Sequence, residues 1–499
     1  MDFQRPSIAS PDAAVSQDQA RRPWQALPAE IRNSIFDCAK TTISPTSKEG
    51  VRSWARVAKE WRSVFLPVLW RTLTFQPSNP SADFREFTEF VVKGQCRPLI
   101  KSVVLHVSLA PYGCDECDQE ECETTISSNN RAFADDVTAG FEHLSKWPAV
   151  ESRTDGITLE LRVNSPSDAQ HMFATSGGRC ARSEEAGYSE TGAARRMLGY
   201  HLRRQSRDAL GHFQNIWENP LHVLRRVGVV DGFSVNRSTL RIIDSRAMRT
   251  MLKAMPNLKS VKHEPWARPL SYEEVEHRNK TNADFFADLP SLARRGLRQV
   301  SFWEAYYPSS DWLDPRYLTF TYPATAMSRA ASASLYATDF ALSSGADPIT
   351  FFSQLCDKAA AIPAQGSQGP VSEFMLPPLS PPGSEPVFEP LLERLALSIC
   401  HEHYPDNWNH SKDPETLLMK AALAASYLYH VKEEEVCITT AATWHTDKNK
   451  KVSEAWEKVA ERHPGLGFRY DTEHIDPETL TETDSICKRL ELYHLLREW

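Results

Sequence analysis

The sequence predicts a mixed α and β chain in which a small helical module precedes a longer region of repeated helix–strand pairs. Two observations support this fold class. Apolar residues between positions 24 and 75 recur at three- and four-residue steps, the period of amphipathic helices. From residue 82 onward, helical stretches repeatedly lead into short strands, an order that favours a parallel or mixed sheet with helices outside it.

The N-terminal module divides into three helical stretches. Leu27-Pro28 begins the first, since proline suits the first turn of a helix, and Leu27, Ile31 and Ile35 then form one apolar stripe. The remaining apolar positions are Val51, Trp54, Ala58, Trp61 and Phe65 in the second stretch, and Leu69, Trp70 and Leu73 in the third. A unit of this size has little core of its own, so we expect a partner to cover part of its apolar surface.

Three short motifs in this module resemble an F-box. They are Leu27-Pro28-x-Glu30-Ile31, Val57-Ala58-Lys59-Glu60-Trp61-Arg62 and Leu69-Trp70-Arg71-Thr72-Leu73. The resemblance implies docking on Skp1 and, through Skp1, on a cullin. Its Skp1-facing surface would be formed or supported by Leu27, Pro28, Ile31, Ile35, Trp61 and Leu69. The alternative is an ordinary helical subdomain over residues 23–75 whose tryptophans fill its own core.

Composition narrows the classes of function. The net charge of −8 argues against general nucleic-acid binding, which needs a concentrated basic surface. No stretch reaches the ~20 apolar residues that span a bilayer, so we expect no membrane partner. Residues 1–22 have the composition of a disordered polar tail without a signal peptide. Ten cysteines without a secretion signal favour reduced thiols and a cytoplasmic or nuclear location.

The C-terminal region contains the phrases MPNLKSV, GLRQVSF and LLERLAL, which resemble leucine-rich repeats at long and irregular spacing. An F-box-like module followed by such a region is similar to the arrangement in filamentous-fungal F-box proteins, whose C-terminal regions are uncharacterised. This resemblance implies an irregular leucine-rich-repeat-like α/β solenoid over residues 82–362 and 387–499, interrupted by a proline-rich, low-complexity linker at residues 363–386. The alternative is an α/β domain whose strands do not stack in sequence order.

The candidate chemical sites are few. Cys114, Cys117 and Cys122 have spacing that could contribute to a zinc site, although the acidic residues between them also fit a solvated loop with incidental thiols. Phosphate-binding and nucleotide-binding glycine motifs, a nucleophile elbow and a zinc-protease helix motif are missing from the sequence. We therefore expect neither a cofactor nor catalysis by this chain.

The chain is thus predicted to be a substrate-recognition adaptor of a Skp1–cullin–F-box ubiquitin ligase that holds an unknown protein target with its larger domain. Trp303, Tyr306 and Tyr307 are candidates for the target-binding surface, or alternatively for the core, because adjacent strand residues face opposite sides. Two other functions stay open: a Skp1-binding protein outside any ligase, and a hidden metal-binding or hydrolytic domain.

Overall fold

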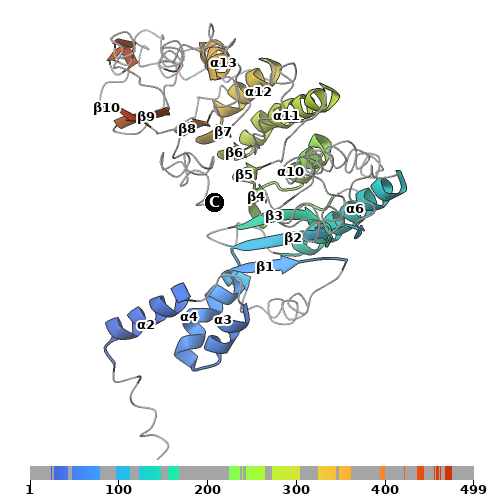
Figure 1. Ribbon diagram of the computed structural model, residues 1–499, viewed down its shortest axis with the longest axis vertical. Helices are drawn as coiled ribbons and strands as arrows, with labels where there is room; N and C mark the ends of the chain where they lie inside the picture. The colour runs from blue at the N-terminus through green and yellow to red at the C-terminus, as the bar shows by residue number, and fades with distance from the viewer. Residues whose placement is uncertain are drawn as a thin grey trace, which may run out of the picture. The chain divides into compact units, whose positions relative to one another are not determined.

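A computed structural model gives the arrangement of a little under half of the chain, in segments spread over both its N-terminal and C-terminal halves (Figure 1). The described residues are 24, 27–42, 48–78, 97–112, 123–147, 156–167, 224–236, 239, 243–264, 272–303, 324–343, 348–360, 394–398, 421, 435–442, 454–455, 457–459, 461 and 467–474. The predicted tail at 1–22 and the predicted linker at 363–386 lie outside these residues.

The chain forms two compact units. Unit 1 comprises Met1–Leu73 and Thr88–Lys101, and unit 2 comprises Thr74–Phe87 and Ser102–Trp499. Unit 1 is mainly helical in the described residues, with α2 (Ala29–Thr42), α3 (Lys48–Ala55), α4 (Lys59–Trp70) and the short 3-10 helix η1 (Arg97–Leu99). The predicted second helical stretch is divided into α3 and α4, and Pro67, which we expected to end it, lies inside α4. The predicted third stretch therefore belongs to α4 as far as Trp70, while Leu73 lies in the strand Thr72–Phe75.

Unit 2 is built on a parallel sheet whose strands follow the order of the chain. The order is β1-β2-β3-β4-β5-β6-β7-β8, and the strand pairs from β2 to β8 are all parallel. The strands are β1 (Thr72–Phe75), β2 (Ser102–Ser108), β3 (Ile157–Asn164), β4 (Val230–Val235), β5 (Ser260–His263), β6 (Gln299–Trp303), β7 (Asp339–Ser343) and β8 (Arg394–Ser398). The predicted mixed α/β class is therefore confirmed. The alternative, an α/β domain whose strands do not stack in sequence order, does not fit the described sheet.

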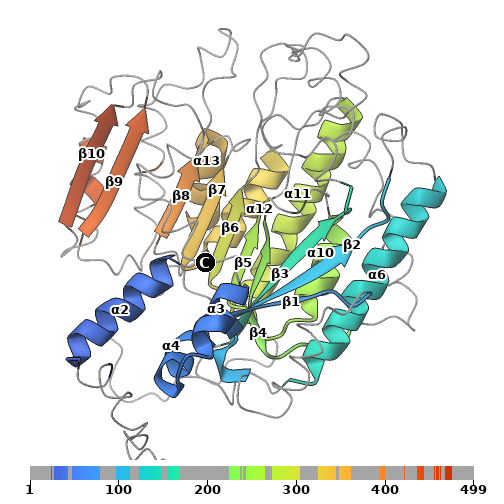
Figure 2. The same cartoon turned by 60° about the horizontal axis from the view of Figure 1, so that its bottom comes forward.

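Helices cover one face of this sheet. They are α6 (Glu123–Ser145), α10 (Ser245–Lys253), α11 (Tyr272–Ala293), α12 (Ala324–Ser334) and α13 (Pro348–Ala360). In both views they lie on the same side of the strands (Figures 1 and 2). The sequence alternates accordingly in β3, where Ile157, Leu159 and Leu161 are fully buried and the residues between them are half-buried.

The pairing register aligns the apolar side chains of successive strands. One row contains Leu159, Phe233, Val261, Val300, Phe340 and Leu395, and the next contains Leu161, Val235, His263, Phe302, Leu342 and Leu397. Both rows are drawn mainly from large aliphatic and aromatic residues. The members of both rows from β3 to β7 are buried and form the core of the unit, because that face of the sheet meets the helices.

The connections between helix and strand use recurring backbone contacts. The amide of Lys259 donates to the carbonyl of Asp231 at 2.7 Å, and the amide of Arg298 donates to the carbonyl of Lys259 at 2.7 Å. The amide of Thr338 then donates to the carbonyl of Arg298 at 2.7 Å. Gly296, with φ of 118°, ends α11 before β6 in a conformation that other residues rarely adopt.

The last described strands form a separate pair. β9 (Glu435–Ala442) and β10 (Gly467–His474) are parallel and constitute a two-stranded sheet. We expected residues 387–499 to continue the larger array. In the described residues β8 does so, whereas β9 and β10 pair only with each other.

His263 in the apolar row gives a first testable prediction. Its side chain is 5 % exposed, contacts Phe285 and Phe302, and its Nδ1 atom has no hydrogen-bond partner among the described residues. Burial lowers the pKa of His263 from 6.5 to about 3. The folded state thus holds the neutral ring while the unfolded chain binds a proton below pH 6.5, so this burial costs stability as the pH falls from 6.5 toward 3.

Replacing His263 with phenylalanine should therefore reduce acid sensitivity. The free energy of unfolding of the wild type should fall relative to that of His263→Phe by at most about 1.4 kcal/mol per pH unit across this window. Urea unfolding at a series of pH values measures the difference. Parallel curves for the two proteins from pH 7 to pH 4 would contradict a neutral, buried His263.

Candidate interaction surfaces

Unit 1 has an aromatic core centred on Trp61. The ring of Trp61 lies 5.3 Å from Trp24, 5.1 Å from Trp54, 5.1 Å from Phe36 and 5.7 Å from Phe65, measured between ring centroids. Phe36 and Phe65 are buried, and the three tryptophans are partly buried against them. The aromatic residues of the second predicted stretch therefore join α2, α3 and α4 into one core.

Glu60 connects the same elements through polar contacts. Its Oε1 atom accepts a hydrogen bond from Arg32 on α2 at 2.5 Å, and its Oε2 atom accepts one from the indole nitrogen of Trp24 at 2.6 Å. These contacts are partly buried, so water screens them less than it screens surface pairs. Glu60 fixes the start of α4 against α2 and orients Trp24 over the aromatic core.

The core of unit 1 buries only part of the apolar face of α2. Phe36 and Ala39 are buried, whereas Ile31 is 47 % exposed and Ile35 is 36 % exposed. Pro28 is exposed as well, and its spacing of three and seven residues from Ile31 and Ile35 puts all three on one side of the chain. We call Pro28, Ile31 and Ile35 the α2 stripe.

Exposed large apolar side chains are concentrated in this unit. Over the described residues of both units, the four found are Ile31, Ile35, Val57 and Val68. All four belong to unit 1. Single exposed apolar residues are ordinary, but their restriction to one small unit among the described residues makes that unit the first candidate for an interaction surface.

The Skp1-facing residues that we predicted divide into two groups. Pro28, Ile31 and Ile35 are exposed and available to a partner, while Leu27 is half-buried. Trp61 and Leu69 pack against the core, where they support the surface without forming it. Sequence reasoning missed Val57, 64 % exposed in the turn after α3, and Val68, 42 % exposed on α4. Helical spacing alone does not separate Val68 from its buried neighbours.

A second candidate surface is the face of the parallel sheet opposite the helices. The register aligns Thr158, Gly232, Ser260, Gln299 and Asp339 in one row, and Glu160, Ser234, Lys262 and Ser301 in the next. Polar and charged residues thus occupy the positions that alternate with the apolar rows. Most are half-buried, and Ser234, Ser301 and Asp339 are buried.

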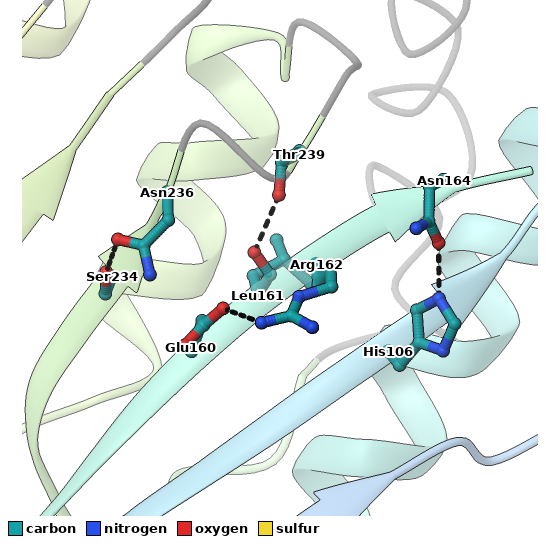
Figure 3. Close-up of polar contacts among 8 residues, drawn as sticks. All are labelled: His106, Glu160, Leu161, Arg162, Asn164, Ser234, Asn236 and Thr239. Carbon is teal, nitrogen blue, oxygen red and sulfur yellow. Dashed lines mark hydrogen bonds and ion pairs between the residues drawn. The ribbon is translucent and has the colours of Figure 1, made fainter. Parts of the chain in front are cut away.

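Polar contacts order this face near the ends of β2, β3 and β4 (Figure 3). Arg162 donates to Glu160 at 2.7 Å, and His106 is hydrogen-bonded to the side chain of Asn164. In the next strand the hydroxyl of Ser234 donates to Asn236 at 2.6 Å. Lys262 on β5 pairs with Glu264 at 3.0 Å, both largely buried. The charges on this face are largely paired with one another, which suits recognition of a polar surface better than binding of a highly charged ligand.

Trp303 is not on a surface. It is 4 % exposed, and its neighbour Phe302 is 1 % exposed. The sequence left two interpretations of Trp303 open, a target-binding surface and the core, and the burial of this side chain agrees with the second. The first interpretation assumes that one face of β6 is open, whereas Val300, Ser301, Phe302 and Trp303 are all buried. Tyr306 and Tyr307 lie outside the described residues.

The candidate zinc ligands Cys114, Cys117 and Cys122 also lie outside the described residues. Within the part of the chain that the structure describes, no group of three or more histidine, cysteine, aspartate or glutamate side chains could hold a metal ion. Among the described helices, none is both long and apolar enough to cross a membrane.

Comparison with known proteins adds one family. Residues 408–496 match the model of a family of unknown function, DUF6546. This stretch contains β9 and β10, the two strands that pair apart from the larger sheet. No curated protein matches the chain.

Proposed function

We propose that this chain is the substrate-receptor subunit of a Skp1–cullin–F-box ubiquitin ligase. In this proposal unit 1 is an F-box that docks on Skp1, and unit 2 holds a protein target. The observation that carries it is the restriction of exposed large apolar side chains, among the described residues, to a helical unit whose sequence resembles an F-box. Small units of this kind gain stability and function together by covering such surface with a partner.

The proposed role of unit 2 rests on its sheet. Its parallel strands follow sequence order, and its helices lie on one side, which supports an irregular leucine-rich-repeat-like solenoid. In such an arrangement the face opposite the helices serves for binding, and among the described residues this face is half-buried at Glu160, Arg162 and Lys262 but buried at Ser301 on β6. We place the target on this polar face, around Arg162, Glu160 and Lys262, in place of Trp303.

Catalysis in this proposal comes from proximity. A receptor that binds a target and Skp1 at once raises the effective concentration of the target near the ubiquitin-loaded enzyme, and it contributes no reacting group. The proposal implies a cytoplasmic or nuclear location, where these ligases work. Recovery of Skp1 without a cullin would favour the alternative of a Skp1-binding protein outside a ligase.

Cys38 offers a direct test of the docking face. Its exposed thiol lies three residues after Ile35 and seven after Ile31, on the same side of α2. We expect purified Skp1 to slow labelling of Cys38 by N-ethylmaleimide by roughly tenfold or more, because the interface excludes the reagent. Peptide mass spectrometry measures the rate, with the buried Cys356 as an internal control that stays unreactive in both states.

Two outcomes would contradict the proposal in different ways. If Skp1 and the chain form no complex in gel filtration, the F-box function is wrong. If they form a complex in which Cys38 reacts as fast as in the free chain, Skp1 docks on a different face from the α2 stripe.

A further inference from the structure

Unit 1 is basic within an acidic chain. Residues 24–73 contain eight lysines or arginines and four aspartates or glutamates, a formal charge of +4, whereas the whole chain carries −8. The remaining residues therefore carry −12. The positive charge of unit 1 is thus a local property and cannot be read from the composition of the chain.

Three of these cations gather around the most exposed large apolar side chain. Val57, 64 % exposed, follows Arg56 in the turn between α3 and α4, and Lys59 and Arg62 lie on the first turn of α4. Lys59 and Arg62 are three residues apart on a helix and are therefore neighbours on its surface. We call Arg56, Val57, Lys59 and Arg62 the α3–α4 site.

The charges of this site are exposed and uncompensated. Arg56, Lys59 and Arg62 are all exposed, and the described residues contain no ion pair to any of them. Glu60, the acidic residue within the site's span, binds Arg32 and Trp24 instead. Glu60 is therefore paired within the unit and does not neutralise the cations of the site, which are exposed.

The local fold does not favour the two cations at the start of α4. The N-terminal end of a helix carries partial positive charge, so Lys59 and Arg62 in the first turn of α4 oppose the helix dipole by a few tenths of a kcal/mol each. Neither Val57 nor the three cations belong to the core of the unit. Stability of unit 1 thus gives no reason for Lys59 and Arg62, whereas Arg56 directly follows the C-terminal end of α3, where the helix dipole favours a cation.

We infer that the α3–α4 site binds an acidic protein surface that has a shallow apolar site for Val57. The inference rests on the proposed function, because we take this surface to belong to the partner that docks on the α2 stripe. Complementary charge at the edge of an interface acts mainly on the rate of association. The site therefore steers the partner electrostatically, while the α2 stripe supplies the apolar anchors.

Two other classes of anionic partner fit the site less well. Single-stranded nucleic acid binds on exposed aromatic platforms, and the described aromatic residues of α2, α3 and α4 pack in the core of unit 1. Interfacial membrane binding uses an apolar helix face that carries aromatic or leucine side chains, whereas the apolar residue here is one valine in a turn.

The test reverses the charges on α4 and measures association with purified Skp1. We expect Lys59→Glu with Arg62→Glu to lower the association rate constant roughly tenfold at about 50 mM salt, and the difference to vanish by about 0.5 M salt. The association rate constant of Lys59→Gln with Arg62→Gln should lie between those of the wild type and of the charge-reversed variant. Glutamate favours a helix N-terminus, so the reversed variant should melt at the wild-type temperature or slightly above it.

A matched control changes the same number of charges in unit 2. Lys253 and Lys358 are exposed on α10 and α13, and Lys253→Glu with Lys358→Glu should leave the association rate constant unchanged. Two outcomes would overturn this inference while the F-box function stands. The first is a wild-type association rate constant that does not depend on salt. The second is an equal association rate constant for the wild type and for Lys59→Glu with Arg62→Glu.

Absence of any Skp1 binding would overturn the proposed function itself. Binding to phosphatidylserine vesicles or duplex DNA that the charge reversal abolishes, without an effect on Skp1, would assign the site to a different class of partner. A tenfold, salt-sensitive loss confined to the α4 variants supports the inference.

Discussion

Replacing Ile31 and Ile35 with alanine is expected to weaken Skp1 binding by roughly 100-fold or more and to leave the melting temperature of the chain unchanged. The two side chains are 47 % and 36 % exposed and lie outside the core of unit 1, so their truncation removes little buried contact. Central apolar anchors of an interface typically cost about 2 kcal/mol or more each, and 1.4 kcal/mol corresponds to a factor of about ten in affinity.

The control for this variant uses the polar side of the same helix. Asn33 and Asp37 are exposed on α2 away from the stripe, and alanine at both positions should bind Skp1 with wild-type affinity. Isothermal titration calorimetry gives the affinities, and differential scanning fluorimetry gives the melting temperatures. Wild-type affinity for Ile31→Ala with Ile35→Ala would show that the stripe is not the docking face.

The sequence predicted the helical character of unit 1 because helical spacing is a local property, but it missed the break between α3 and α4 and the passage of α4 through Pro67. Leu27, Ile31 and Ile35 were assigned to one stripe by spacing, and Ile31 and Ile35 are exposed together on α2. It was harder to predict from the sequence which of the apolar helix residues lie in the core and which lie on the surface. Trp61 and Ile31 are both apolar residues at helical spacing, and only the packing of three helices puts the first in the core.

The order of the sheet was also partly predictable. Repeated helix–strand pairs indicated a parallel sheet, and the strands from β2 to β8 are parallel and in sequence order. Two features depend on distant parts of the chain: the sequence left the first open between core and surface, and it missed the second. Both faces of β6 are buried, which puts Trp303 in the interior, and β9 pairs with β10 instead of extending the larger sheet.

Truncating Trp61 should give the largest loss of stability in unit 1. Trp61 contacts four aromatic rings at centroid distances from 5.1 to 5.7 Å and joins α4 to α2 and α3. A large-to-small change of this kind costs about 3–5 kcal/mol in a packed core, which is comparable to the whole stability of a small unit. We therefore expect Trp61→Ala to unfold unit 1 and to abolish Skp1 binding.

Hydrogen exchange distinguishes a variant that loses Skp1 binding because unit 1 unfolds from a variant that loses it because the α2 stripe is truncated. In Trp61→Ala the amides of α2, α3 and α4 should lose protection, while those of β2–β7 keep it, because the chain folds as two compact units. Ile31→Ala with Ile35→Ala should keep protection in both units. Trp61→Phe preserves an aromatic ring among Trp24, Trp54 and Phe36, so it should retain the protection of unit 1 and most of the Skp1 affinity. If the helices of unit 1 stay protected in Trp61→Ala, the aromatic cluster does not hold them together, and the docking surface must be supported in another way.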